Sequence, residues 1–389
     1  MFKILTLNNI SPVGLERLPR DSYEVASEIV HPDAILVRSH NMHAMELPPS
    51  VVAIGRAGAG VNNIPVDKCS QRGVVVFNAP GANANAVKEL VLAGMLMAYR
   101  NIGAAWRYAQ SLQGDDASMN AQMEKEKKRF AGFELPNRTL GVVGLGAIGV
   151  KVANAAIALG MKVIGYDPGI TVQGAWQLSS QVQQALSLDD LLLRADFISF
   201  HVPLNNATKN LLNADRIKLL KKGAVILNFA RYGIVDDAAV IAGLDSDKIR
   251  AYVCDFPNNL IKDHPRVIAL PHIGASTEEA EENCAVMVAD QVRDYLENGN
   301  VRNSVNFPEV VMPKSEGCCR LAVVNVNVPN MLGQLTSDLG TAGINISEIV
   351  NRSRGELAYT LVDVNTPLTP EVLAQIAAIN GVLAVRKVG

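Results

Sequence analysis

The stretch LGVVGLGAIGVKVANAAIALG (residues 140–160) decides the fold of its region. It begins with a short apolar run typical of a buried strand and ends with a longer run typical of a helix. Between the two runs, glycines at positions 144, 146 and 149 have the G-x-G-x-x-G spacing. The first permits a tight turn, the second lets the backbone approach a pyrophosphate, and the third lets helix and strand pack closely. The stretch predicts a Rossmann-type dinucleotide site with contacts from Gly144, Gly146, Ala147 and Ile148.

An acidic residue, Asp167, ends the next apolar strand. A carboxylate at that position accepts hydrogen bonds from the ribose hydroxyls of adenosine and repels a 2′-phosphate. We therefore expect the cofactor to be NAD rather than NADP. The alternative is a glycine turn followed by a chance acidic residue, and the matching strand, helix and carboxylate make it the weaker interpretation.

On both sides of this stretch, short apolar runs alternate with helical ones, which favours parallel α/β sheets. A long apolar helix is expected over about 84–107. The expected strands before it are Lys3–Leu7, Ala34–Arg38, Val51–Arg56 and Val74–Asn78. The expected strands of a doubly wound sheet are Thr139–Val143, Lys162–Tyr166, Phe197–Phe200, Ala224–Asn228, Ile249–Cys254 and Val267–Leu270.

A further unit is expected after a helix over about 277–297 and a linker that contains Pro308 and Pro313. Its pattern predicts the βαββαβ order of a ferredoxin-like fold. The expected elements are the strands Arg320–Val326, Ile346–Arg352, Ala358–Val364 and Val382–Lys387 and the helices Met331–Ala342 and Pro370–Ile379.

Composition narrows the function classes. The chain has 389 residues, 49% of them hydrophobic, and a formal net charge of -2. This length suggests two or three domains, and this charge gives no broad attraction to nucleic acid or to an anionic membrane. The five scattered cysteines have no metal-ligand spacing, so we expect reduced thiols, no metal site and a cytoplasmic location.

Two residues are candidates for redox chemistry on a 2-hydroxy acid, which needs a base for the hydroxyl proton and a cation for the carboxylate. His272, in LPHIGAS, follows an apolar strand at the place where α/β sheets bind ligands. Arg231, in NFARYGIVDD, carries a guanidinium that can grip a carboxylate with two parallel hydrogen bonds. A lone loop histidine is more often structural, and an isolated arginine more often forms a surface ion pair.

The motifs occur in an order that resembles the D-2-hydroxyacid dehydrogenase family. GLGAIG, Asp167, HVPL (201–204), NFAR with VDD (228–237) and PHIGAST (271–277) carry the resemblance. RAGAGVNNI (56–64) and NAPGANANAVKELV (78–91) are similar to that family's substrate domain, and the C-terminal unit resembles an ACT domain. The resemblance covers essentially the whole chain, and the combination is similar to the phosphoglycerate dehydrogenase branch.

The resemblance implies an α/β architecture of three parts. A doubly wound Rossmann NAD domain (101–274) would be inserted in a flavodoxin-like substrate-binding domain (1–100 and 275–305), followed by a ferredoxin-like ACT regulatory domain (317–389). The implied reaction is NAD-dependent oxidation of 3-phospho-D-glycerate to 3-phosphohydroxypyruvate, the first step of phosphorylated L-serine biosynthesis. A homodimer or homotetramer is also implied.

The resemblance also implies residue roles. His272 would be the catalytic acid/base, and Arg231 would bind the substrate carboxylate and carbonyl. Substrate would also be held by Arg38 and Arg56 at its phosphate and by the backbone of Ala57, Gly58, Ala59 and Gly60 at its carboxylate. Asp255 would bind the nicotinamide carboxamide, and the remaining cofactor contacts would be His201, Val202, Pro203, Asn228, Ala230, His272 and Gly274. L-serine would bind as an effector at Asn325, Asn327 and Asn345, where Asn325 replaces the family's histidine.

The sequence also departs from the family pattern. The glutamate that normally follows the Asp255 position and pairs with the histidine is absent, and the nearest match is Asn259. We expect a lower pKa for the base, or another carboxylate such as Asp255 in its place. Two other functions stay open: glyoxylate or hydroxypyruvate reduction, and an NAD-sensing binding protein without catalysis.

Overall fold

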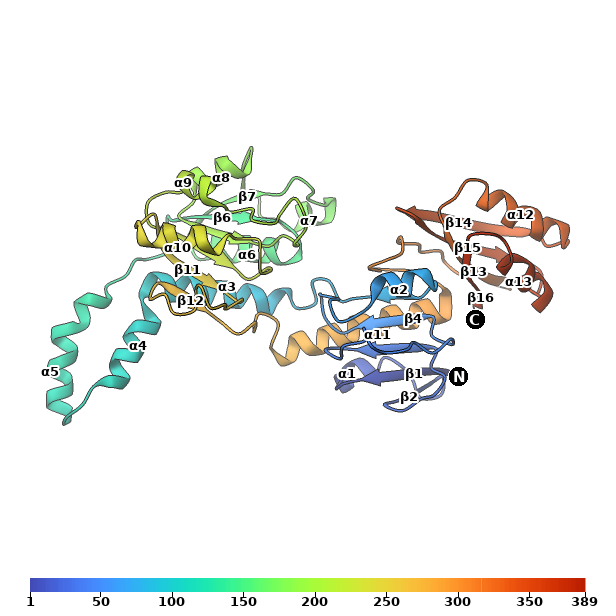
Figure 1. Ribbon diagram of the computed structural model, residues 1–389, viewed down its shortest axis with the longest axis horizontal. Coiled ribbons are helices and arrows are strands. Elements are labelled where there is room, and N and C mark those ends of the chain that lie inside the picture. Colours follow the sequence, from blue (N-terminus) through green and yellow to red (C-terminus); the bar gives the residue numbers. More distant parts are fainter. Residues whose placement is uncertain (316, 389) are drawn as a thin grey trace. The chain divides into compact units, whose positions relative to one another are not determined.

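The chain forms two compact units in the computed structural model, which describes residues 1–315 and 317–388. The first unit comprises residues 1–83 and 278–389, and the second comprises 84–277. Position 389, the expected end of the C-terminal domain, lies outside the described residues. Figure 1 shows the elements of each unit.

The first unit is built on a parallel sheet with the strand order β2-β1-β3-β4-β5. This is the strand order of flavodoxin-like sheets, as expected. The strands are β1 (Phe2–Leu7), β2 (Tyr23–Ala26), β3 (Ala34–Val37), β4 (Ala53–Arg56) and β5 (Val75–Phe77). The expected strands are confirmed, whereas β2 was not expected, because the four residues of YEVA are too few to stand out in the sequence.

Both faces of this sheet are covered, which explains why its central strand, β3, is apolar at every position. Helices α1 (Pro12–Leu15) and α11 (Glu278–Asn298) cover one face, where Ile4 and Leu36 pack against Val288 and Val292. Helix α2 (Val66–Gln71) covers the other face through Cys69. The long helix α11 returns the chain to this sheet, as expected.

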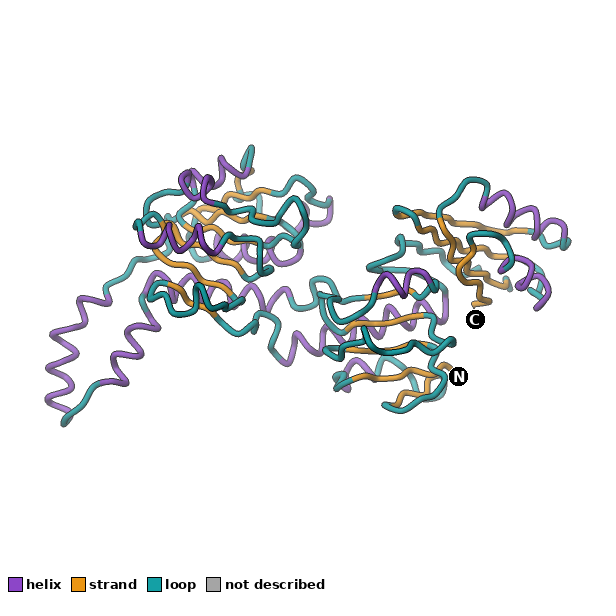
Figure 2. Tube along the Cα trace, viewed as in Figure 1, coloured by secondary structure: helices purple, strands orange, loops and turns teal. Residues whose placement is uncertain are grey.

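An antiparallel sheet follows within the same unit, with the strand order β14-β15-β13-β16. The elements occur in the predicted βαββαβ order. They are β13 (Cys319–Val326), α12 (Met331–Thr341), β14 (Ile346–Arg354), β15 (Leu357–Val364), α13 (Pro370–Ala377) and β16 (Val382–Val388). Figure 2 shows the two helices of this part alongside its strands.

A fully buried ion pair ties this antiparallel sheet to the preceding linker. Arg320 Nε donates to Asp363 Oδ1 at 2.6 Å, and a second guanidinium nitrogen donates to Asp363 Oδ2 at 2.7 Å. The same guanidinium donates to the carbonyl oxygens of Asn298, Met312 and Pro313. Because every guanidinium N–H has an acceptor, Arg320 fastens the end of α11 and the linker to β13 and β15.

The second unit is a doubly wound parallel sheet with the order β12-β11-β10-β9-β6-β7-β8. Its strands are β6 (Thr139–Val143), β7 (Lys162–Tyr166), β8 (Gln183–Gln184), β9 (Phe197–Phe200), β10 (Ala224–Asn228), β11 (Ile249–Cys254) and β12 (Val267–Ala269). The expected strands are confirmed. The short β8 was missed because its two glutamines carry no strand signal.

Helices cover both faces of this second sheet. Helices α3 (Ala84–Arg100) and α6 (Ala147–Ala158) pack on one face. The other helices are α7 (Val172–Gln177), α8 (Leu188–Arg194), α9 (Ala214–Leu219) and α10 (Asp237–Asp245), of which α8, α9 and α10 pack on the other face.

The position of α3 corrects the expected domain boundary. This helix packs on the second sheet, where a Cβ at Gly94 would lie 3.1 Å from both Phe229 and Val253. The boundary therefore lies at 83/84 and 277/278 rather than at 100/101 and 274/275. The expected helix over about 84–107 is also interrupted, because Asn101 adopts a positive φ of 51°.

After Asn101, two helices and a turn project from the rest of the second unit (Figure 1). They are α4 (Ile102–Ser111), α5 (Asp116–Glu126) and a 3-10 turn, η1 (Lys127–Phe130). Every residue of α4 and α5 is at least partly exposed, including the large apolar side chains of Trp106 and Met123. We refer to residues 102–130 as the helical arm.

Within residues 1–315 and 317–388, every helix is too short or too polar to span a lipid bilayer. Over the same ranges there is no group of three or more His, Cys, Asp or Glu side chains placed to hold a metal ion. The five cysteine thiols are free.

Candidate functional site

The carboxyl ends of the parallel strands in the second unit carry most of the residues that the sequence singled out. Gly144 follows β6, Asp167 follows β7, His201 follows β9, Asp255 follows β11, and Arg231 and His272 lie three residues beyond the ends of β10 and β12. Because the strands are parallel, these residues gather at one edge of the sheet. That edge is where open α/β sheets bind their ligands.

The glycine-rich turn has the close contacts that its spacing predicts. Gly144 has a positive φ of 91°, and a Cβ there would lie 2.6 Å from the carbonyl oxygen of His201. A Cβ at Gly149 would overlap the carbonyl oxygen of Gly144. Both positions therefore require glycine, the first for the turn beside β9 and the second for packing of α6 on β6.

The middle glycine of the turn is different, because a Cβ at Gly146 would meet only open space. Gly146 is the N-cap of α6, and among the described residues no side chain caps this helix end. The first backbone N–H groups of α6 point out of the helix end and attract an anion. This open, uncapped end fits the pyrophosphate of a dinucleotide, with Ala147 and Ile148 in the first turn.

Asp167 holds the glycine-rich turn from the neighbouring strand. Its Oδ2 accepts the N–H of Leu145 at 2.8 Å, and its Oδ1 accepts the N–H of Gly169 at 2.8 Å. The carboxylate is partly exposed beside the turn. It is therefore placed to accept ribose hydroxyls in addition to these backbone donors.

At the end of β9, the backbone of His201 lies against the glycine-rich turn at Gly144. The Ser199 hydroxyl is 2.8 Å from His201 Nε2, while the Nδ1 atom is shielded and unpaired in the described part of the chain. Burial lowers the pKa of His201 to about 4, so the ring is neutral at physiological pH. Val202 is half-buried and Pro203 exposed.

The loop that carries Arg231 is shaped by the buried amide of Asn228. Asn228 Nδ2 donates to the Arg231 carbonyl at 3.0 Å, and Asn228 Oδ1 accepts the N–H of Ala230 at 3.2 Å. The Arg231 guanidinium is exposed, and one of its nitrogens donates to the Ala230 carbonyl at 2.6 Å. The loop thus presents a solvent-accessible cation at the sheet edge.

Asp255 has a structural role that the sequence did not suggest. Its side chain is 1% exposed, and its two carboxylate oxygens accept the N–H groups of Ile273 at 2.9 Å and Gly274 at 2.7 Å. Its own N–H donates to the Asn228 carbonyl at 3.2 Å. Asn228 and Asp255 therefore join the Arg231 loop to the His272 loop through hydrogen bonds.

The His272 ring is exposed and lies beside an aromatic ring. The ring centroids of Phe256 and His272 are 5.1 Å apart, at an interplanar angle of 56°. His272 has a φ of 57°, a conformation that costs a non-glycine residue about 1 kcal/mol. Among the described residues, neither Asp255 nor Asn259 forms a hydrogen bond with the imidazole, so neither expected replacement for the missing glutamate pairs with it here.

The expected phosphate ligands lie in the first unit, at the carboxyl ends of adjacent strands. Arg38 follows β3, and Arg56 ends β4 with its Nε donating to the Arg38 carbonyl at 3.0 Å. A guanidinium nitrogen of Arg38 also hydrogen-bonds to Glu281 of α11, a partner that the sequence did not indicate. The structure therefore brings the two arginines together.

The backbone N–H groups of residues 57–60, the expected carboxylate cradle, differ in whether they already have an acceptor. Ala57 is buried and donates its N–H to the Val37 carbonyl at 2.8 Å, and Gly58 donates its N–H to the Arg56 carbonyl at 2.7 Å. The N–H groups of Ala57 and Gly58 therefore already have backbone acceptors. Among the described residues, the N–H groups of Ala59 and Gly60 have no acceptor, so they are the donors left for a substrate carboxylate.

The three expected effector residues differ in exposure. Asn325 is buried, and its amide donates to the Val326 carbonyl at 2.8 Å. Asn327 and Asn345 are exposed, and the Asn327 amide donates to the Gly355 carbonyl at 3.1 Å. The Asn325 side chain lies in the interior of β13, and its expected role as an effector contact stays a prediction.

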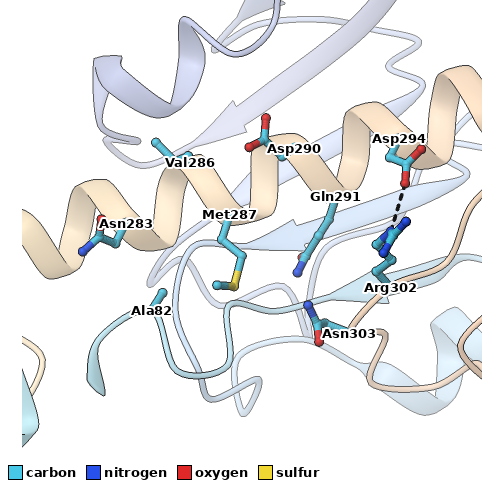
Figure 3. Close-up of a pocket in the computed structure, with 9 residues that line it drawn as sticks. All are labelled: Ala82, Asn283, Val286, Met287, Asp290, Gln291, Asp294, Arg302 and Asn303. Atoms are coloured by element: carbon cyan, nitrogen blue, oxygen red, sulfur yellow. Dashed lines mark hydrogen bonds and ion pairs between the residues drawn. The ribbon is translucent and has the colours of Figure 1, made fainter. Parts of the chain in front are cut away.

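A hollow of about 680 Å³ lies along α11 in the first unit (Figure 3). Gln291 points toward Asn303 in this view, and Arg302 forms an ion pair with Asp294 at 3.3 Å. Ala82, Asn283, Val286, Met287 and Asp290 complete its lining. The hollow is lined by residues other than the expected catalytic ones, so it is separate from the candidate site.

Comparisons with known proteins point to one family. The model of the D-isomer specific 2-hydroxyacid dehydrogenase NAD binding domain matches residues 92–274. A D-3-phosphoglycerate dehydrogenase from Haemophilus influenzae is 33% identical over 95% of this chain and 89% of its own length. One from Methanocaldococcus jannaschii is 36% identical over 92% of this chain and 67% of its own length.

A solved structure agrees with these relatives. The NAD+-bound 3-phosphoglycerate dehydrogenase of Entamoeba histolytica has a TM-score of 0.61 and 28% identity, and the match covers 78% of this chain and 98% of that one.

Proposed function

The chain belongs to the D-isomer specific 2-hydroxyacid dehydrogenases, and from that premise we propose that it oxidises 3-phospho-D-glycerate to 3-phosphohydroxypyruvate. It is an NAD-dependent dehydrogenase. Relatives that match nearly its full length bear the name D-3-phosphoglycerate dehydrogenase. The observation that carries the proposal is the gathering of the glycine-rich turn, Arg231 and His272 at the carboxyl edge of one parallel sheet.

His272 is the proposed acid/base. An exposed imidazole next to Phe256 is accessible to the C2 hydroxyl of a substrate and takes its proton as the C2 hydrogen leaves. Without a carboxylate partner, the positive charge that develops on the ring gains less stabilisation.

Arg231 is the proposed cation for the substrate carboxylate and for the developing carbonyl oxygen. A guanidinium binds a carboxylate through two parallel hydrogen bonds and so fixes its orientation. The hydrogen bonds between Asn228 and the Arg231 loop set the direction in which this side chain leaves the backbone. Arg38, Arg56 and the N–H groups of Ala59 and Gly60 are the proposed contacts to the phosphate and carboxylate in the first unit.

Bound NAD supplies the hydride acceptor for this reaction. The residues proposed to hold it are the first turn of α6 for the pyrophosphate, Asp167 for the ribose, and the neutral His201 ring with Val202 and Pro203. Asp255 is proposed to hold the loop that faces the nicotinamide, because both of its carboxylate oxygens are bound to that loop.

A substrate panel tests the proposed reaction. The full chain is mixed with NAD and with 3-phosphoglycerate, D-glycerate or D-lactate, and NADH is followed by absorbance. We expect 3-phosphoglycerate to have the highest kcat/KM, and we expect NADP to replace NAD poorly. Preference for an unphosphorylated acid supports instead a glyoxylate or hydroxypyruvate reductase, and absence of turnover with every acid supports an NAD-binding protein without catalysis.

We also propose that two copies associate through the helical arm. The arm exposes Trp106 and Met123, and apolar side chains on helices without a packing face are typical of an interface. Light scattering of the full chain and of Trp106→Glu tests this: we expect a dimer or tetramer for the first and smaller species for the second.

The C-terminal βαββαβ part is proposed to be an ACT domain that binds L-serine at Asn327 and Asn345. Both side chains are exposed in loops at the ends of its elements. Titrating L-serine against the initial rate is the test. A rate that stays constant to millimolar serine removes this role and leaves the part as an assembly element.

A further inference from the structure

One of the two arginines proposed to bind phosphate, Arg38, is already hydrogen-bonded to a carboxylate. Glu281 lies in the first turn of α11, and its Oε1 accepts a hydrogen bond from a guanidinium nitrogen of Arg38. The two side chains are 36% and 40% exposed, so the pair is open to solvent. A ligand that arrives from solvent can therefore reach it.

Three charges cluster at this point. Arg56 Nε donates to the Arg38 carbonyl, which brings the second guanidinium next to the Arg38 backbone. Burial raises the pKa of the Cys284 thiol, while Arg56 and Arg38 lower it and Glu281 raises it. One thiol in α11 thus lies within the electrostatic reach of both guanidinium groups and of the carboxylate.

A carboxylate and a phosphate compete for the same guanidinium. Each binds through oxygens that match the fork of N–H donors. Glu281 neutralises the charge of Arg38 in this pair, so a phosphate dianion meets less positive charge while Glu281 is ionised. The Arg38 hydrogen bond lowers the pKa of Glu281, which keeps this carboxylate ionised at neutral pH.

We propose that Glu281 is an internal anion that binds Arg38 in the free protein and is displaced by the phosphate of the substrate. The inference rests on the proposed function. Because recognition is an exchange of one anion for another, Glu281 lowers the affinity for phosphate while it keeps Arg38 extended from β3. An unphosphorylated hydroxy acid leaves the pair intact, so Glu281 changes the affinity for phosphorylated substrates only, and it acts through Arg38.

The test compares Glu281→Gln with Glu282→Gln in the full chain. Glu282 is the next residue of α11 and is exposed, and among the described residues its side chain has no polar partner, so it controls for the loss of one charge. An exposed ion pair is worth about 0.2–1 kcal/mol, which corresponds to up to about fivefold in affinity. We expect Glu281→Gln to lower the KM for 3-phosphoglycerate by about two- to fivefold at low salt, with kcat and thermal midpoint unchanged.

A second measurement does not depend on turnover. Inorganic phosphate is titrated into each variant by calorimetry, and Glu281→Gln is expected to bind it more tightly by the same factor. The difference should shrink as ionic strength rises, because exposed charges are screened. Glu282→Gln is expected to match the wild type in both measurements.

Three results overturn the inference: an unchanged KM and phosphate affinity in Glu281→Gln, a raised KM, or an equal gain in Glu282→Gln. A raised KM means that the carboxylate only positions Arg38. Failure of the wild type to oxidise 3-phosphoglycerate is a separate outcome, which removes the proposed function while the phosphate titration still decides whether the anion exchange occurs.

Discussion

Asp255 Oδ2 accepts the backbone N–H of Gly274 at 2.7 Å, and the other carboxylate oxygen accepts the N–H of Ile273 at 2.9 Å. A buried carboxylate with two backbone donors is a rigid support, because neither oxygen can turn away without leaving an unpaired donor. The residue before these two donors is His272. The position of the candidate base thus depends on an acidic side chain that does not contact it through a hydrogen bond.

Asp255→Asn tests this support. The amide keeps one acceptor and places an NH2 group against a backbone donor, so the loop shifts. We expect kcat to fall about 100-fold and the free energy of unfolding to fall by about 1.5–3 kcal/mol. Steady-state kinetics and urea unfolding measure the two effects. Asp263→Asn, at an exposed residue paired only with Lys262, is the matched control, and equal behaviour of the two variants contradicts the support role.

The glycine-rich turn predicts opposite outcomes for the same substitution at two positions. Gly146→Ala adds a methyl group in open space where the pyrophosphate is expected. The free energy of unfolding should therefore stay unchanged, while the Kd for NAD should rise about tenfold or more. Gly149→Ala forces a methyl group onto the Gly144 carbonyl and lowers stability by about 1–3 kcal/mol. Calorimetric NAD titration and thermal melting separate them; a destabilised Gly146→Ala with normal NAD affinity argues against the site.

His201 predicts a loss of stability in acid. Its pKa is lowered from 6.5 to about 4 by burial, so the unfolded chain takes up a proton at a higher pH than the folded one. The free energy of unfolding should therefore fall as the pH drops from about 6.5 to 4, with a contribution of at most about 1.4 kcal/mol per pH unit. Urea unfolding across this range, repeated for His201→Gln, measures it. The free energy of unfolding should change less steeply with pH in His201→Gln than in the wild type. Identical slopes contradict the burial of a neutral His201 ring.

The Arg320–Asp363 pair predicts a large, local loss of stability. Arg320→Met leaves a buried carboxylate unpaired, which costs about 3–5 kcal/mol. Arg302→Met, which breaks an exposed pair with Asp294, should cost about 1 kcal/mol or less. Thermal melting with limited proteolysis compares them, and we expect early cleavage in the linker before β13 only for the first. Similar melting of the two variants contradicts a fastening role.

Much of the fold was predictable from local pattern. The apolar runs of β6, β7, β9, β10 and β11 were placed correctly, because a doubly wound sheet buries both faces of its central strands. Edge strands such as β2 and β8 escaped prediction because they are short, and β8 is also polar. The unit to which α3 belongs also escaped, since an apolar helix does not reveal which of two sheets will cover it.

The site was predictable where spacing along the chain fixes chemistry, as in the turn that starts at Gly144. It was not predictable where contacts join distant residues. Nothing in the sequence near Asp255 indicates that its oxygens would bind Gly274, or that Glu281 would meet Arg38, 243 positions earlier. Such partners follow from the order of strands in a sheet, which short motifs do not encode.

The central claim is that His272 and Arg231 act together in hydride removal from a phosphorylated 2-hydroxy acid. The most direct measurement is single-turnover NADH formation from 3-phosphoglycerate by the wild type, His272→Ala and Arg231→Ala, each with NAD affinity determined in parallel. We expect each variant to lose about 10²–10⁴-fold in rate while binding NAD as the wild type does. Equal rates in the wild type and His272→Ala would contradict the account.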